Sequence, residues 1–287
     1  VYDSDKNSIG FTYNVNNTQV NAGSYTTTVQ MVASTPSSNY QIGTNGTKVW
    51  QIAQKTITIS FTGSNTYTYN GTNQGVTVTI SGIVPNDNAV KLTTTASVMD
   101  NVGFTSSTAI SNTQYVFSSK NAGSYSLSIT GITDSNGNTG ASCNYTATLP
   151  ASFSWVINKL NITLTWGVTV FEYNAATQSL ALPTITNTVG SDVVAVAWND
   201  SAPIYVHSAK NRGTYTARLS STLTGADAGN YAIPAGILTK SWEITARLIR
   251  IGWGDGLFTY NGQKQGITVT LENIITGDNV AFLADIV

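Results

Sequence analysis

Three sequence motifs recur along this chain in one fixed order, and no other feature restricts the possible folds as strongly. The first joins a tyrosine to a glutamine five residues later and begins at Tyr69, Tyr173 and Tyr260. The second, Asn-Ala-Gly-Ser-Tyr or Asn-Arg-Gly-Thr-Tyr, spans 21–25, 121–125 and 211–215. The third pairs Asn-Tyr with a tryptophan ten or eleven residues after the tyrosine, at Trp50, Trp155 and Trp242. Motifs that keep one order at near-constant spacing predict tandem copies of a single structural unit.

The boundary between copies is predicted between each tryptophan strand and the Ile-x-Ile strand that follows it. It gives complete copies at 54–158 and 159–245, the C-terminal half of a copy at 1–53 and the N-terminal half of a copy at 246–287. The copy 54–158 carries an insertion near 95–118. Because the two flanking halves together make about one more copy, we expect the native polypeptide to continue in both directions with the same repeat.

Within each copy, apolar and hydroxyl side chains alternate with the period of a β-strand. Ile57, Ile59 and Phe61 alternate with threonine and serine, and the segments 76–80 and 162–166 follow the same pattern. Turns rich in Asn, Asp and Gly separate these segments, and no stretch has the apolar spacing of a helix. We therefore predict an all-β fold of tandem Ig-like β-sandwich domains arranged as an elongated rod. A β-grasp topology is the alternative if the insertion contains a helix.

The recurring aromatic residues have structural interpretations. A glycine two residues before a tyrosine that opens a strand is typical of the tyrosine corner of Ig-like sandwiches. The pattern covers Gly23, Gly123 and Gly213 with Tyr25, Tyr125 and Tyr215. The three tryptophans alternate with isoleucines and are expected in cores or at domain junctions, and the Tyr-Asn-Gly turns are expected to supply a positive-φ glycine and hydrogen bonds to loop backbone. The alternative is that these rings stack against sugars.

The composition excludes several classes of function. Charged residues make up 9% of the chain, and 13 Lys plus Arg against 14 Asp plus Glu form no basic patch for nucleic acid or anionic lipid. One histidine, His207, and one cysteine, Cys143, leave little for catalysis or transition-metal binding, so no enzymatic activity is expected. No run of residues approaches the length of an apolar membrane span, so no membrane insertion of this segment is expected either.

The order of motifs resembles the MBG-type repeats of large bacterial surface proteins and adhesins. The resemblance covers essentially the whole chain and includes a lysine near each boundary, Lys55 and Lys159, with Arg247 in the last copy. Ala175 departs from it where the turn would carry glycine. The resemblance implies an extracellular array at the cell surface that serves as a non-catalytic stalk or filament. Its partners would be neighbouring repeats of the same chain, further copies of the chain in a filament, or surface glycans.

Several residues are candidates for calcium binding or modification. Asp134, Asn136 and Asn138, and likewise Asp3, Asp5 and Asn7, place oxygen ligands at alternate positions, although both segments lack the glycine and glutamate of an EF-hand loop. Plain turns are the competing interpretation for these segments and for the recurring Asp87, Asp192 and Asp278. No other cofactor is expected. Asparagine glycosylation sequons, which matter only in a host that glycosylates its surface proteins, occur at Asn16, Asn45, Asn70, Asn144, Asn161 and Asn199.

Two further hypotheses concern crosslinking and ligand binding. Lys159 or Lys240 could form an intramolecular isopeptide bond with help from Glu172 or Glu243, provided that the acid is buried. The alternative function is a carbohydrate-binding or adhesive β-sandwich module, in which Phe104, Tyr115 and Phe117 of the insertion would form an exposed platform. Aromatic rings buried in each copy would favour the stalk instead.

Overall fold

The computed structural model confirms an all-β chain with several separate sheets. It describes residues 11–13, 18–31, 39–44, 46–85, 87, 90–98, 106–111, 113–201, 204–281 and 283. Asp3, Asp5, Asn7, Asn16, Asn45 and Phe104 lie outside the described residues. The chain divides into two compact units, Val1–Asn158 and Lys159–Val287, which are described separately.

The described residues of the first unit form three sheets. Strands β1 (Phe11–Tyr13), β2 (Gly23–Met31) and β3 (Thr47–Ile52) form an antiparallel sheet in that order. The copy 54–158 has one sheet of order β5-β12-β10-β7 and another of order β11-β4-β6-β9-β8. Their bounds are β4 (Lys55–Gly63), β5 (Thr66–Thr68), β6 (Gln74–Ser81), β7 (Lys91–Val98), β8 (Ser106–Ser111), β9 (Gln114–Ser119), β10 (Gly123–Thr133), β11 (Tyr145–Ala147) and β12 (Phe153–Asn158), with the 3-10 turn η3 (Gly140–Ser142).

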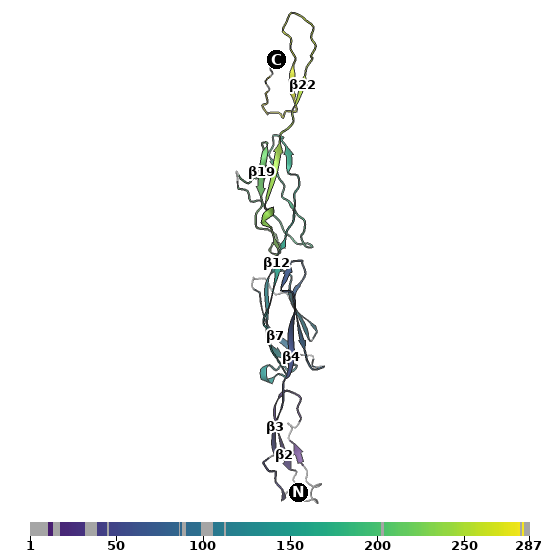
Figure 1. Ribbon diagram of the computed structural model, residues 1–287, viewed down its shortest axis with the longest axis vertical. Coiled ribbons are helices and arrows are strands. Elements are labelled where there is room, and N and C mark those ends of the chain that lie inside the picture. The colour runs from purple at the N-terminus through teal and green to yellow at the C-terminus, as the bar shows by residue number, and fades with distance from the viewer. Residues whose placement is uncertain are drawn as a thin grey trace. The chain divides into compact units, whose positions relative to one another are not determined.

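The two sheets of the copy 54–158 enclose its core. Ile57 and Ile59 of β4 are buried, as are Leu127 of β10 and Ile157 of β12 in the other sheet, while the threonines and serines between them face outward. Strands β4 and β7 belong to different sheets of this copy (Figure 1). The alternation of apolar and hydroxyl side chains along these strands therefore determines which face of each strand is buried.

The segment 95–118 contributes strands to this copy. In its described residues β7 ends, β8 forms, and β9 pairs with both β8 and β6, so β9 lies inside its sheet. The β-grasp alternative required a helix in this segment, and the described part of it contains none. In the copy 159–245 the strand β18 (Ser208–Ala209) pairs with β16 (Gln178–Ser179) as β9 pairs with β6.

The second unit has shorter strands and several small sheets. A three-stranded sheet of order β15-β21-β19 contains the core residues Ala217, Trp242 and Ile244. The remaining bounds are β13 (Leu160–Asn161), β14 (Leu164–Thr165), β15 (Val170–Glu172), β17 (Thr184–Ile185), β19 (Gly213–Arg218), η4 (Ala228–Asn230), β20 (Tyr231–Ala232), η5 (Ala235–Ile237), β21 (Thr239–Thr245), β22 (Arg250–Trp253) and β23 (Val269–Glu272). The half-copy 246–287 contains the strand pair β22–β23.

The Tyr-Asn-Gly turn has the same geometry in three copies. The asparagine Oδ1 accepts the backbone N–H two residues on, at 3.0 Å for Asn70, 2.9 Å for Asn174 and 3.0 Å for Asn261. The next residue has positive φ, which is 77° at Gly71, 60° at Ala175 and 76° at Gly262. The motif glutamine then donates to the carbonyl six residues earlier, from Gln74, Gln178 and Gln265. Ala175 therefore occupies a left-handed position that glycine takes in the other copies.

Replacing Ala175 with glycine is expected to stabilise the second unit. The left-handed conformation costs a non-glycine residue about 1–2 kcal/mol, and the greater freedom of glycine in the unfolded chain takes back part of that gain. We expect a net gain of about 0.5–1 kcal/mol, seen as a rise of about 2–5 °C in the thermal transition of this unit. The matched change Gly71→Ala should act in the opposite direction on the first unit, and a loss of stability in Ala175→Gly would contradict the argument.

Candidate functional site at the junctions between copies

In each copy the tyrosine of the Asn-Ala-Gly-Ser-Tyr motif anchors the loop before it. Its hydroxyl donates to the backbone carbonyl four residues upstream, at 2.6 Å for Tyr25 and Asn21, 2.7 Å for Tyr125 and Asn121, and 2.6 Å for Tyr215 and Asn211. A Cβ added at Gly123 would lie 3.3 Å from the Tyr125 hydroxyl oxygen, so the ring requires a small residue there. The Asn21 and Asn211 loops lie at one end of their copies, where the next copy of the same unit begins.

Each of these tyrosines also packs against the tryptophan of the neighbouring strand. The pairs face each other directly in register, with ring centroids 5.1 Å apart for Tyr25 and Trp50, 5.3 Å for Tyr125 and Trp155, and 4.9 Å for Tyr215 and Trp242. Trp155 and Trp242 are buried, whereas Trp50 of the half-copy is half-buried. These rings are therefore part of the cores, with little surface available for stacking on a sugar in the complete copies.

Two of the recurring aspartates, Asp87 and Asp192, accept hydrogen bonds from tyrosines of the Asn-Tyr motif. The Tyr145 hydroxyl donates to Asp87 Oδ2 at 2.7 Å and accepts the Val84 N–H at 3.2 Å. The Tyr231 hydroxyl makes the same two contacts, with Asp192 Oδ2 at 2.7 Å and the Val189 N–H at 2.8 Å. Burial, together with the hydrogen bond to Asp87, raises the pKa of Tyr145 above its ordinary value. The turn that carries each aspartate is thereby fixed to the second half of its own copy.

In the first unit, a loop of the copy 54–158 holds the preceding half-copy. Asn144 accepts the Ala22 N–H at its Oδ1, at 2.7 Å, and donates from Nδ2 to Asn21 Oδ1 at 3.1 Å. Asn136 Nδ2 donates to the same Asn21 oxygen at 3.3 Å. A pocket of about 260 Å³ beside these contacts is lined by Val20, Ala22, Ile52, Ala53, Lys55, Val84, Asp87, Asn144 and Tyr145. The anchored loop of one copy thus meets the aspartate turn of the next.

Asp134 organises the loop that makes this contact. Its buried carboxylate accepts backbone N–H bonds from Asn136, Asn138 and Asn144, each at 2.9 Å. Burial alone would raise the pKa of Asp134, but the hydrogen bonds from Asn138, Asn144 and Asn136 outweigh it and hold that pKa below its ordinary value. The calcium candidates Asp134, Asn136 and Asn138 therefore lie together, with N–H donors directed at the carboxylate oxygens. These bonds hold the geometry of the loop.

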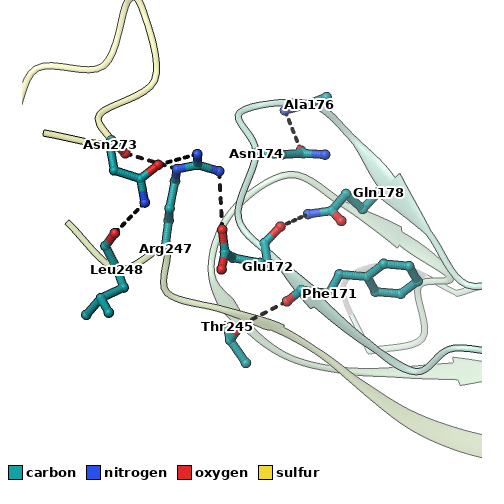
Figure 2. A network of polar contacts seen from close by, with 9 residues as sticks. All are labelled: Phe171, Glu172, Asn174, Ala176, Gln178, Thr245, Arg247, Leu248 and Asn273. Carbon is teal, nitrogen blue, oxygen red and sulfur yellow. Dashed lines mark hydrogen bonds and ion pairs between the residues drawn. The ribbon is translucent and has the colours of Figure 1, made fainter. Parts of the chain in front are cut away.

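In the second unit, Arg247 links the copy 159–245 to the half-copy that follows. Figure 2 shows its guanidinium between Glu172 and Asn273, donating from Nη1 to Glu172 Oε1 at 3.2 Å and from Nε to the Asn273 carbonyl at 3.0 Å. Asn273 in turn donates to the Leu248 carbonyl at 2.6 Å and has a φ of 65°. Arg247 occupies the boundary position of Lys55, so a boundary cation contacts both copies here.

The aspartate turn completes this second junction. The Tyr173 hydroxyl of the earlier copy donates to Asp278 Oδ1 of the half-copy at 3.1 Å. Burial and this bond to the carboxylate raise the pKa of Tyr173. A pocket of about 290 Å³ is lined by Tyr173, Asn211, Arg212, Ala246, Arg247, Ile249, Asn273, Ile274, Ile275, Asp278 and Val280. As in the first unit, the pocket lies where the anchored loop, the boundary cation and the aspartate turn come together.

Removing the side chain of Arg247 is expected to loosen this junction. Arg247→Met keeps the aliphatic stem but loses the bonds to Glu172 and Asn273, worth about 1 kcal/mol together at a partly exposed site. We expect backbone amides of the segment 269–278 to exchange about five times faster with solvent, measured by hydrogen exchange. Glu172→Gln keeps the Asn273 contacts and should change these rates less than about twofold. If both variants changed the exchange rates equally, the bonds from Arg247 to Asn273 would not be what holds the segment 269–278.

Apart from Glu172 and Asn144, which take part in the junction contacts, the other candidate residues lie elsewhere in the chain. Phe117 is buried and the Tyr115 hydroxyl donates to the Val90 carbonyl, so these two rings do not form an exposed platform. Glu172 and Glu243 are exposed, although the isopeptide hypothesis needs a buried acid. His207 contacts Asp200 and stacks on Trp198 at 4.9 Å between ring centroids. Among the sequons, Asn70, Asn161 and Asn199 are exposed, whereas the Asn144 amide is engaged at the first junction.

Neither the scan against protein-family models nor the search of curated proteins found a match. Within the described residues, no helix has the length and apolar character needed to cross a membrane. The same part of the chain contains no group of three or more His, Cys, Asp or Glu side chains placed to share a metal ion.

Proposed function

We propose that this chain is a non-catalytic structural region, a stalk or filament, of an extracellular surface protein or adhesin, built from tandem Ig-like β-sandwich domains. The observation that carries the proposal is the recurrence of one junction in both units. In each unit the anchored loop of one copy meets the boundary cation and the aspartate turn of the next. A chain that only needed independent domains would have no reason to repeat the contacts between them.

The chemistry of the junctions suits a stiff array. Asn144 and Arg247 make several directional bonds across their junctions, and directional bonds resist bending better than apolar contact alone. The tyrosine corners and the two-sheet core of 54–158 support an Ig-like sandwich for each copy. The low charge of the surface reduces the dependence of such contacts on salt. The cell-surface location rests on the resemblance to MBG-type repeats.

The decisive experiment labels the native protein on intact cells of its source. Antibodies raised against residues 159–245 should bind at the outer surface without permeabilisation, and on a denaturing gel they should detect a polypeptide several times heavier than the 30.3 kDa of this chain. Labelling only after permeabilisation would overturn the proposal. A native mass equal to that of this chain would contradict the array.

A further inference from the structure

The Tyr-Asn-Gly turn of the copy 54–158 places a nucleophile beside an electrophile. Asn70 is exposed, and its Oδ1 accepts the Thr72 N–H at 3.0 Å. The ring closed by this bond contains both the Asn70 side-chain carbon Cγ and the Gly71 backbone nitrogen. Attack of that nitrogen on Cγ forms a five-membered imide. Glycine favours this reaction, because it has no Cβ to crowd the approach of the backbone.

Thr72 supplies a second donor to the group that would react. Its hydroxyl donates to Asn70 Oδ1 at 2.7 Å, beside the bond from its N–H. Attack on Cγ moves negative charge onto this oxygen, and donors already directed at the oxygen stabilise that charge, as they do in an oxyanion hole. The Gly71 N–H, which must lose its proton, has no acceptor among the described residues. Electrophile, nucleophile and donors thus lie together within residues 70–72.

The same turn in the copy 159–245 lacks two of these features. Asn174 Oδ1 accepts the Ala176 N–H at 2.9 Å (Figure 2), but Ala176 has no hydroxyl to act as the second donor. Ala175 stands where the first turn has Gly71, and its Cβ crowds the nitrogen that would attack. Ala175 occupies this position although its φ of 60° is unfavourable for a residue with a side chain. A strained residue of this kind suggests a role for its side chain beyond the fold of the turn.

A second Asn-Gly pair shows that this dipeptide alone does not create the site. Asn136 is exposed and precedes Gly137, but the Gly137 N–H donates to the Asp134 carbonyl at 3.0 Å. The Asn136 side-chain amide donates to Asn21 Oδ1 at 3.3 Å. The nucleophile and the side chain are therefore both held, and attack requires that these bonds break first.

We propose that Asn70 is a site of spontaneous deamidation and that Ala175 protects the equivalent Asn174. The Gly71 nitrogen loses its proton to solvent base and bonds to Asn70 Cγ, the bond from Cγ to the side-chain nitrogen breaks, and ammonia leaves with a proton returned by solvent. Water then opens the imide at either carbonyl, which gives aspartate or isoaspartate and a new negative charge. No enzyme, metal or oxidant takes part. The inference goes beyond the proposed function and does not depend on it.

The two products differ in their effect on the turn. Aspartate keeps a side-chain oxygen that can accept the Thr72 N–H. Isoaspartate instead inserts an additional carbon atom into the main chain. The bond from Gln74 Nε2 to the Thr68 carbonyl, which closes the turn at 3.1 Å, then has to span a longer chain. The turn is therefore expected to loosen as isoaspartate accumulates.

Peptide mapping by mass spectrometry tests this proposal on the purified whole chain, free of glycans and aged at mildly alkaline pH. In the folded chain, Asn70 should convert at least about tenfold faster than Asn136 and Asn174. In chain unfolded by guanidinium chloride, Asn70 and Asn136 should convert at similar rates, because both precede glycine and neither turn is held. An Asn70 that stays intact in the folded chain, or converts there no faster than Asn136, would overturn the proposal.

Variants separate the chemistry of the site from general loosening of the turn. Thr72→Ala, which matches Ala176, should slow the conversion of Asn70 about threefold or more, whereas Thr72→Ser keeps the hydroxyl and should convert like wild type. Ala175→Gly combined with Ala176→Thr transfers the site, and Asn174 should then convert like Asn70. A thermal transition of the second unit no lower than in wild type shows that this gain is not due to unfolding. An Asn174 that stays intact in the folded double variant would contradict the proposal.

Discussion

Replacing Trp155 with alanine is expected to lower the free energy of unfolding of the copy 54–158 by about 3–5 kcal/mol. Trp155 is buried, lies 5.3 Å from the Tyr125 ring and 6.3 Å from the Phe153 ring between centroids, and joins β12 to β10 across the sheet. Its removal leaves a cavity that the neighbouring strands cannot close, and it also exposes the ring that anchors the Asn121 loop. The corner and the core should therefore weaken together.

Calorimetry of the whole chain measures this effect. The transition of the first unit should fall by more than about 12 °C, while that of the second unit changes little, because the chain divides into two compact units and Trp155 lies in the first. Trp242→Ala should produce the reciprocal result. Trp50→Ala should cost about half as much or less, since Trp50 is only half-buried. If all three Trp→Ala variants lost the same amount of stability, burial in a complete copy would not explain the effect of these rings.

The all-β fold could be predicted because its signals are local. Ile57 and Ile59 alternate with threonines over a few residues, and a strand with one buried face needs nothing more to be recognised. The lengths of the strands could not be predicted in the same way. The equivalent segment around Ile162 and Leu164 is divided between β13 and β14, because pairing with distant strands decides where hydrogen bonding continues.

The contacts of the aspartate turns and of the junctions were beyond sequence reasoning for a different reason. Asp87 and Asp192 each had a sufficient local explanation as turn residues, yet their partners Tyr145 and Tyr231 lie 58 and 39 residues away. A signal for this pairing was present, since the aspartate and the Asn-Tyr motif recur together in both complete copies. Arg247 was recognised as a boundary cation, but its partner Glu172 belongs to the preceding copy, and no spacing rule relates two copies across a junction.

Replacing Asp134 with alanine is expected to destabilise the first unit by about 2–4 kcal/mol, because three backbone N–H groups then lose their common acceptor. Asp134→Asn should cost less, about 1–2 kcal/mol, since one side-chain oxygen can still serve two of these donors. Both variants should also speed hydrogen exchange at the Ala22 amide, whose acceptor Asn144 is held by this loop. An unchanged first unit in Asp134→Ala would contradict the organising role of the carboxylate.

Acidity provides an independent test of the same group. The pKa of Asp134 is lower in the folded chain than in the unfolded chain, so its contribution is present above the ordinary carboxyl value of about 3.9 and is lost as the pH falls through the lowered folded value. We therefore expect the free energy of unfolding of the first unit, measured in urea from neutral pH down to about pH 2, to fall more steeply in wild type than in Asp134→Asn. Equal slopes would show that the carboxylate is not charged in the folded loop. A calcium-dependent rise in the wild-type transition, absent from Asp134→Asn, would instead assign the loop to a metal ion, because the N–H donors and a cation compete for the same carboxylate oxygens.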